Sequence, residues 1–248
     1  MYRSIRILLA LGLLAIAGAG VAAGADKPAT AWLRADIVLD ANGTLSSIAW
    51  PDQKAGGAVL TDHLEKIIRT WEFEPGRFDG APAITKTRLN LEVSLEKSRQ
   101  GDLQVAILHA NTGVGFNSMP PPRYPFPAAQ RGYSAELRIR LAIDEQGKVA
   151  SASVIGYQGE SLDKWIRKAF EDAGMTAVQS WTFQPEQVAG KPLASQADVP
   201  ILFCMESTWC KKQEAARRAT DSSSASADQA IALDSAVKIR RWSGTADI

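Results

Sequence analysis

The sequence is poor in the residues on which catalysis and metal binding most often depend. Its 248 residues include two histidines and two cysteines. His63 and His109 lie far apart, and no histidine, cysteine and carboxylate residues recur at the spacing of a metal site. The motifs of serine hydrolases, phosphate-binding loops and zinc proteases are missing too. We therefore predict that the protein is not an enzyme, uses no cofactor or metal and has no small-molecule substrate.

The chain also lacks an excess of charge of either sign. It carries 28 basic and 27 acidic residues, and no basic stripe stands out. A nearly neutral protein of this kind gives no reason to expect nucleic acid as a partner. Hydrophobic residues make up 46% of the chain, which is enough for a packed core.

Long apolar runs are absent except at the N-terminus. Arg3 and Arg6 precede an apolar run over 7–23, and Ala23-Gly24-Ala25 follows it. A basic start, an apolar middle and small residues at the end are typical of a secretory signal peptide, which we assign to residues 1–25. The alternative is a short uncleaved membrane anchor, because the run is just long enough to span a bilayer.

Export would place the two cysteines in an oxidising compartment. Cys204 and Cys210 are close enough in sequence to close a small loop, and we expect a structural disulfide between them. Two unpaired thiols are the alternative.

An ordered series of residues occurs twice in the chain. Each copy has a strand that ends in an Asp-x-x-Gly turn, then an amphipathic segment, then a Trp-x-Phe-x-Pro element. The matched residues are Leu33, Asp40, Gly43, Trp71, Phe73 and Pro75 in the first copy and Leu137, Asp144, Gly147, Trp181, Phe183 and Pro185 in the second. Such a series indicates an internal duplication.

The hydrophobic pattern predicts an α+β fold with two tandem units. In each, alternating residues predict a β-hairpin and a final strand, and an apolar stripe predicts a helix between them. The first unit covers 31–109, a linker covers 110–120, and the second unit covers 121–206. Residues 211–248 read as a mostly disordered tail with a weak helix over 231–242. Ser161 is expected to cap the second helix.

The second unit resembles the C-terminal domain of the TonB family. The matching elements are Pro122-Arg123-Tyr124-Pro125, Asp144 with Gly147, Trp181-Thr182-Phe183-Gln184-Pro185, and Val199-Pro200-Ile201 with Phe203. The first unit resembles a diverged second copy. The resemblance implies a compact sheet-and-helix domain in the periplasm, with no active site. It implies an outer-membrane TonB-dependent receptor, or another envelope protein, as partner.

In this family a short extended segment of the receptor, the TonB box, adds as a strand to an open sheet edge. Carried over, the resemblance places partner-binding residues on the last strand and beside it: Tyr124, Gln187, Ser195, Ala197, Asp198, Val199, Pro200, Ile201 and Phe203. Pro200 lacks an N–H, so its position must face the free edge or a bulge. It could equally protect that edge from unwanted pairing. Tyr124 could instead pin the segment before the first strand to the sheet.

Two departures from the family bear on function. In the family, an uncleaved anchor carries a histidine that couples to the proton-motive motor, and a long Pro-rich spacer crosses the periplasm. Here the apolar N-terminal segment holds no histidine, and the Pro-rich stretch 120–122 is far too short to be such a spacer, so we do not expect the chain to transmit force by that route. One alternative is a structural envelope protein that self-associates as a homodimer through sheet edges, for example along Arg88–Leu95 unless Leu103–Leu108 covers it. The other is a shortened, membrane-anchored transducer.

Overall fold

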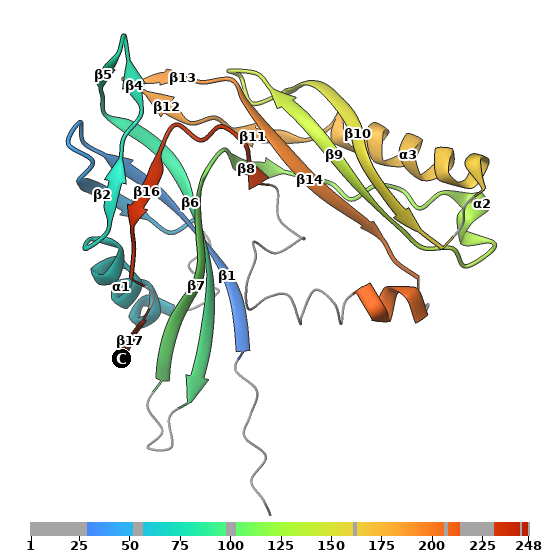
Figure 1. The fold of residues 1–248 in the computed structure, drawn as a ribbon, viewed down its shortest axis with the longest axis horizontal. Helices are drawn as coiled ribbons and strands as arrows, with labels where there is room; N and C mark the ends of the chain where they lie inside the picture. The colour runs from blue at the N-terminus through green and yellow to red at the C-terminus, as the bar shows by residue number, and fades with distance from the viewer. Residues whose placement is uncertain are drawn as a thin grey trace, which may run out of the picture.

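The computed structural model describes residues 29–51, 57–97, 103–160, 163–205, 208–213, 231–243 and 245–247. The chain folds into a mixed α/β structure with antiparallel sheets and few helices (Figure 1). The predicted signal peptide, Ser161 and the segment 220–227 lie outside the described residues. Within those residues, no helix is both long and apolar enough to cross a membrane.

The first block of the fold covers residues 29–97. Its elements are β1 (Ala29–Leu39), β2 (Leu45–Ala49), α1 (Gly57–Ile68), β3 (Glu72–Glu74), β4 (Arg77–Phe78), β5 (Ala81–Pro82) and β6 (Thr85–Lys97). Strand β1 lies between β2 and β6, antiparallel to both. The apolar stripe of α1 packs on the alternate buried residues of β1 and β6, as the hydrophobic periodicity predicts.

The second block, residues 135–203, repeats this order of elements. It consists of β9 (Ala135–Ile143), β10 (Val149–Gly159), α3 (Lys164–Val178), β11 (Thr182–Gln184), β12 (Gln187–Val188), β13 (Lys191–Pro192) and β14 (Ser195–Phe203). Strand β9 lies between β10 and β14, as β1 lies between β2 and β6. A short helix, α2 (Phe126–Ala129), precedes the block and contacts α3.

The turns of the two hairpins share one chemistry. The Asp40 carboxylate accepts hydrogen bonds from the N–H groups of Asn42 and Thr44, both at 2.8 Å. The Asp144 carboxylate accepts the same pair of bonds from Gln146 and Lys148. Both aspartates therefore form turns, as the sequence predicts.

The two tryptophans and the phenylalanines of the Trp-x-Phe-x-Pro elements are core residues. Trp71 and Phe73 belong to the first hydrophobic cluster, and Trp181 and Phe183 to the second. Each element crosses the hairpin turn at a glycine. A Cβ on Gly43 would lie 2.1 Å from the Phe73 carbonyl oxygen, and one on Gly147 would lie 2.1 Å from that of Phe183. The spacing of the repeated residues therefore reflects a backbone-to-backbone contact that leaves no room for a side chain.

Helix α3 differs from the prediction in its cap. The N-cap is Asp163, whose carboxylate accepts the Trp165 N–H, and not Ser161. Trp165 is exposed, whereas Phe170 is fully buried. Gly174 faces the sheet, where a Cβ would lie 2.6 Å from the Leu137 side chain. The glycine that weakens the helix as a local element thus lets it pack closely on β9.

The prediction of a spacer over 110–120 is wrong, because most of these residues are strand. Strand β7 (Leu103–Gly113) pairs along β6, and β8 (Gly115–Ser118) pairs with β11. Pairing gives the backbone groups of this segment partners that a free linker would lack. Of the two possibilities left open for Arg88–Leu95, the structure shows the covered edge: β6 is paired on both sides, so this strand is not open to self-association.

The two blocks also share a sheet. Strand β12 of the second block pairs with Lys86 and Thr85 at the start of β6, on the side that β7 takes further along. The hairpin β12–β13 thus continues the first sheet, so the two blocks are joined by strand pairing and are not independent domains (Figure 1).

The tail differs most from expectation. In place of a weak helix over 231–242, it forms the short strands β15 (Ile231–Ala232), β16 (Lys238–Arg241) and β17 (Thr245–Asp247). They pair with β14, β3 and β7, respectively. Trp242 also packs against Trp71, with ring centroids 5.8 Å apart. Partners distant in sequence, which a local pattern cannot reveal, make this segment extended.

The contact at Gly147 can be separated from the strain of its backbone. Gly147 has φ 76° and Gly190 has φ 78°, but a Cβ on Gly190 would meet nothing within 4 Å. Gly190→Ala is expected to cost about 1–2 kcal/mol of the free energy of unfolding, the cost of a left-handed non-glycine residue. Gly147→Ala should cost clearly more, because the hairpin must also move away from Phe183. Urea unfolding of both variants measures this, and equal losses would contradict the clash.

Candidate functional site

Strand β14 is the edge on which the candidate site lies. It pairs along its whole length with β9 on one side (Figure 1). Its odd-numbered side chains are buried toward the core: Ser195, Ala197, Val199, Ile201 and Phe203. The even-numbered side chains lie on the opposite face and are more exposed. The strand therefore has the alternation that the sequence predicts.

The backbone groups of β14 also alternate between its two sides. Gln196 bonds away from β9, since its carbonyl accepts the Leu233 N–H and its N–H donates to the Asp234 carboxylate. In an antiparallel ladder every second residue bonds to the same side. Asp198, Pro200 and Leu202 therefore direct their backbone groups outward as well. Pro200 stands where its missing N–H costs no bond to β9, as expected of a proline in an edge strand.

The outer side of β14 is covered in its first half only. Strand β15 pairs with Ala197 and Asp198. From Val199 to Phe203, no strand within the described residues pairs with this side. The predicted docking strand is therefore divided into a half that the chain's own tail occupies and a half that is open.

A groove of about 410 Å³ runs beside the open half. Both blocks line it. The second supplies Trp181, Val199, Pro200, Ile201 and Leu202, the first supplies Trp32, Arg34 and Asn90, and the segment between them supplies Phe116, Met119 and Pro122. Its walls are thus largely aromatic and aliphatic, with one cationic side chain.

An ion pair fixes the middle of the site. The Arg140 guanidinium on β9 donates to both carboxylate oxygens of Asp198, at 2.7 and 2.8 Å. This bond from Arg140 holds the pKa of Asp198 below its usual value. Because Arg140 is half exposed, solvent screens the pair, so we regard it as orienting rather than strongly stabilising.

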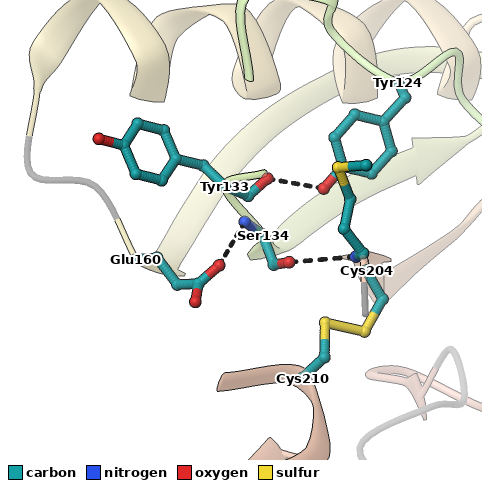
Figure 2. Close-up of a disulfide and its surroundings, with 7 residues drawn as sticks. Tyr124, Tyr133, Ser134, Glu160, Cys204 and Cys210 are labelled. Atoms are coloured by element: carbon teal, nitrogen blue, oxygen red, sulfur yellow. Dashed lines mark hydrogen bonds between the residues drawn. A yellow bond between two sulfur atoms is a disulfide. The ribbon is translucent and has the colours of Figure 1, made fainter. Parts of the chain in front are cut away.

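Tyr124 packs against the end of β14. Its ring meets those of Phe203 and Phe170 edge-on, with centroids 5.7 and 5.9 Å apart. Its hydroxyl donates to the Tyr133 carbonyl at 2.6 Å (Figure 2). Burial raises the pKa of this phenol. These contacts match the second of the two roles open for Tyr124, that of pinning the segment before β9 to the sheet.

The predicted disulfide joins Cys204 to Cys210 directly after β14 (Figure 2). Ser134 lies beside it, and its Oγ accepts a hydrogen bond from the Met205 N–H at 3.1 Å. The Ser134 N–H in turn donates to the Glu160 carboxylate at 2.8 Å. The end of the candidate strand is thus fastened to the start of β9.

Gln187 lies away from this edge. As part of β12, it is paired with Lys86 on one side and Pro192 on the other. Its backbone therefore serves the shared sheet. Of the predicted site residues, the structure brings together those of β14 and Tyr124, but not Gln187.

Sequence reasoning missed the junction around Glu186. This carboxylate is 3% exposed and accepts hydrogen bonds from the Thr87 hydroxyl at 2.5 Å, the Ser235 hydroxyl at 2.9 Å and the Ala236 N–H at 2.9 Å. The three donors come from the first block and the tail. Burial raises the pKa of Glu186 despite these bonds, and Asp234 adds to the rise. The alternation of Ile231 with Leu233 and of Val237 with Ile239 was the available signal for the tail strands.

No metal site accompanies this edge in the part of the chain that the structure describes. There, no three histidine, cysteine, aspartate or glutamate side chains converge in a way that could hold an ion. The site consists of the backbone groups of β14 and the largely apolar side chains of the groove. Its geometry defines the class of a small α/β protein with an open, antiparallel edge strand.

Comparison with known proteins finds a similarity that covers the second block. Residues 120–205 match the family described as Gram-negative bacterial TonB protein C-terminal. The TonB protein of Vibrio cholerae is 27% identical over 85 residues, 34% of this chain and 32% of that protein. The TonB protein of Xanthomonas campestris pv. campestris is 28% identical over 97 residues, 39% of this chain and 40% of that protein. Residues 120–205 are thus similar to the C-terminal domains of TonB proteins.

A solved structure is also similar. It is the solution NMR structure of the Pseudomonas aeruginosa TonB CTD, with 25% sequence identity and a TM-score of 0.31, which covers 38% of this chain and 89% of that one. The match to the curated TonB proteins spans well under half of their length.

The two perturbed carboxylates predict opposite responses of stability to pH. Because the folded pKa of Glu186 lies above its ordinary 4.5, the stability of the wild type relative to Glu186→Gln is greatest below that pH and falls as pH rises through the folded pKa. Because the folded pKa of Asp198 lies below its ordinary 3.8, the stability relative to Asp198→Asn is present above that value and is lost as pH falls.

Urea unfolding of the wild type and both variants across this pH range measures the two differences. Each variant serves as the control for the other, because a general effect of pH would move both differences in the same direction. A Glu186 difference that stays constant from acid to neutral pH would contradict the assigned cause.

Proposed function

We propose that the chain is a TonB-type protein-binding module that takes up an extended peptide by β-strand addition. The observation that carries this proposal is the outer side of β14 from Val199 to Phe203. This stretch is regular strand with no strand partner on that side within the described ranges, and it borders an apolar groove. Backbone hydrogen bonds would supply affinity, and side-chain contacts in the groove would supply selectivity.

The first block offers a physical precedent for such docking. There β6 holds the place that β14 holds in the second block, next to the central strand. Its outer side carries β7, antiparallel, from Arg88 onward. A peptide on β14 would take the position that β7 takes on β6, so the edge geometry is compatible with a further strand.

The first block also gives the proposed site its second wall. Trp32 and Arg34 on β1 face the groove from across β14. An apolar side chain of the peptide could contact Trp32, Phe116 or Met119, and an acidic one could approach Arg34. We propose that the first block, which we interpret as a diverged copy of the second, supports binding in this way.

The similarity to TonB proteins suggests the kind of partner. A segment of an outer-membrane TonB-dependent receptor, or of another envelope protein, fits the proposed role in transport. The N-terminal pattern supports export to the periplasm, with an inner-membrane anchor if the signal is not cleaved. Catalysis forms no part of this proposal, since an edge strand binds without any reacting group.

A synthetic TonB-box peptide tests the proposal. We expect its addition to ¹⁵N-labelled protein to shift the amide signals of Val199–Phe203 and the indole signal of Trp32. Leu202→Pro removes an outward N–H and should weaken binding about 2- to 10-fold, the equivalent of one hydrogen bond. No shifts along Val199–Phe203 at millimolar peptide would refute the proposal.

Leu202→Ala is the matched control, because it shortens the same side chain and keeps the N–H. Equal weakening by both variants would assign the effect to the side chain and contradict strand addition. Light scattering at the same concentrations identifies the remaining possibility, a homodimer in which the open edges of two copies pair with each other.

A further inference from the structure

The first half of the docking edge already holds an extended segment, and that segment is the chain's own tail. Strand β15 runs antiparallel to β14, with Ala232 opposite Ala197 and Ile231 opposite Asp198. The pairing continues one residue further, where the Leu233 N–H donates to the Gln196 carbonyl at 2.9 Å. The outward backbone groups of Gln196 and Asp198 are thus taken.

The tail ends this pairing with a side-chain cap. At the place where the next backbone bond would form, the Gln196 N–H donates to the Asp234 carboxylate at 2.9 Å. The chain then turns away from β14, and the Ser235 hydroxyl and the Ala236 N–H reach Glu186. Strand β15 is therefore a short, capped addition to the edge.

The residues that follow β15 are anchored much more firmly. Val237 is 2% exposed within the first hydrophobic core, and its carbonyl accepts the Thr112 hydroxyl at 2.7 Å. Strand β16 then pairs with β3. In contrast, β15 comprises two residues, and Leu233, which directly follows it, is 46% exposed. A segment with few buried contacts opens at low free-energy cost, so β15 can leave the edge while the anchor stays in place.

The open half of the edge offers an incomplete set of bonding groups. Leu202 presents both its N–H and its carbonyl outward, but Pro200 presents only a carbonyl. A peptide confined to this half would gain few backbone bonds. Asp198 and Gln196 each have both groups, so a peptide that reaches them gains a full ladder, and it can do so only where β15 now lies.

We infer that β15 is a built-in competitor for the docking edge, which an extended partner segment must displace in order to pair with β14 from Leu202 to Gln196. The inference rests on the proposed function, because the competition is for the same strand. The apparent affinity of the partner segment would equal its affinity for the free edge multiplied by the fraction of molecules in which β15 has left the edge. The partner segment must be long enough to pass Pro200, and short peptides that stop before it would bind without competition.

Two variants of the full chain weaken β15 without touching β14. Leu233→Pro removes the N–H that donates to Gln196, and Asp234→Ala removes the cap. Each is expected to tighten binding of a TonB-box peptide that spans the edge by about 2- to 10-fold, the equivalent of one hydrogen bond. Leu233→Ala keeps the N–H and serves as the control, with unchanged affinity expected.

Amide hydrogen exchange supplies a readout that needs no peptide. In the wild type the Asp198 N–H should exchange more slowly than the outward Leu202 N–H, and Leu233→Pro should remove this difference. The Val199 and Ile201 amides, which bond to β9, should not change. Equal exchange at Asp198 and Leu202 in the wild type would overturn the inference, whatever the peptide does.

The outcomes separate this inference from the proposed function. If the peptide binds the wild type and Leu233→Pro equally well while Asp198 is protected, the competition is refuted and docking stands. If the peptide binds neither protein, docking is refuted and the competition with it, while exchange still reports whether the tail pairs with β14. Tighter binding to both tail variants, together with faster exchange at Asp198, is the result we expect.

Discussion

Backbone groups at the edge of a sheet need partners, and this requirement shapes the whole chain. On the β6 side, the first sheet is extended by β7, the next strand along the chain, and by two elements from far away in sequence: the hairpin β12–β13 and the tail strand β17. The tail strand β16 covers β3 in the same way that β8 covers β11. Against this background, the stretch from Val199 to Phe203 stands out, because it is the part of β14 that no described strand pairs with on its outer side. The candidate site is defined by what the fold does not cover.

Buried charge holds the two blocks in register. Arg88 on β6 is 7% exposed, and its guanidinium donates to Asp36 of the same sheet and to Gln184 of the second block. In the opposite direction, Glu186 of the second block accepts hydrogen bonds from Thr87 of the first block and from the tail. Removal of one partner from such a buried contact leaves a desolvated polar group without a hydrogen bond. The free-energy cost of that group exceeds the net stabilisation that the intact contact provides. These contacts therefore select one arrangement of the blocks, and the groove between them follows from it.

Local patterns in the sequence predict the parts of the fold that local physics determines. The alternation in β1, β9 and β14, the aspartate turns and the disulfide all follow from spacing and residue type. The sharing of a sheet between the blocks, the strands of the tail and the junction at Glu186 do not, because they depend on pairings between segments distant in sequence, which leave no local period. The site was predicted as one continuous edge for the same reason: β14 has the pattern of an open strand, and its partner β15 is short and distant. Gln187 was predicted to lie beside the edge because it is close to β14 in sequence. In the structure its strand pairs with β6 of the first block instead.

The shared sheet bears on the order in which the molecule can be made. A chain emerges from the ribosome N-terminus first, and a typical domain folds as soon as it is complete. Here the first block cannot complete its sheet until β12 and β13 have been synthesised, and β3 and β7 wait for the last residues of the chain. Strands β16 and β17 pair with segments more than 100 residues earlier in the chain, which favours slow folding. The two blocks, although they share the same order of elements, therefore complete their folding together as a single cooperative unit.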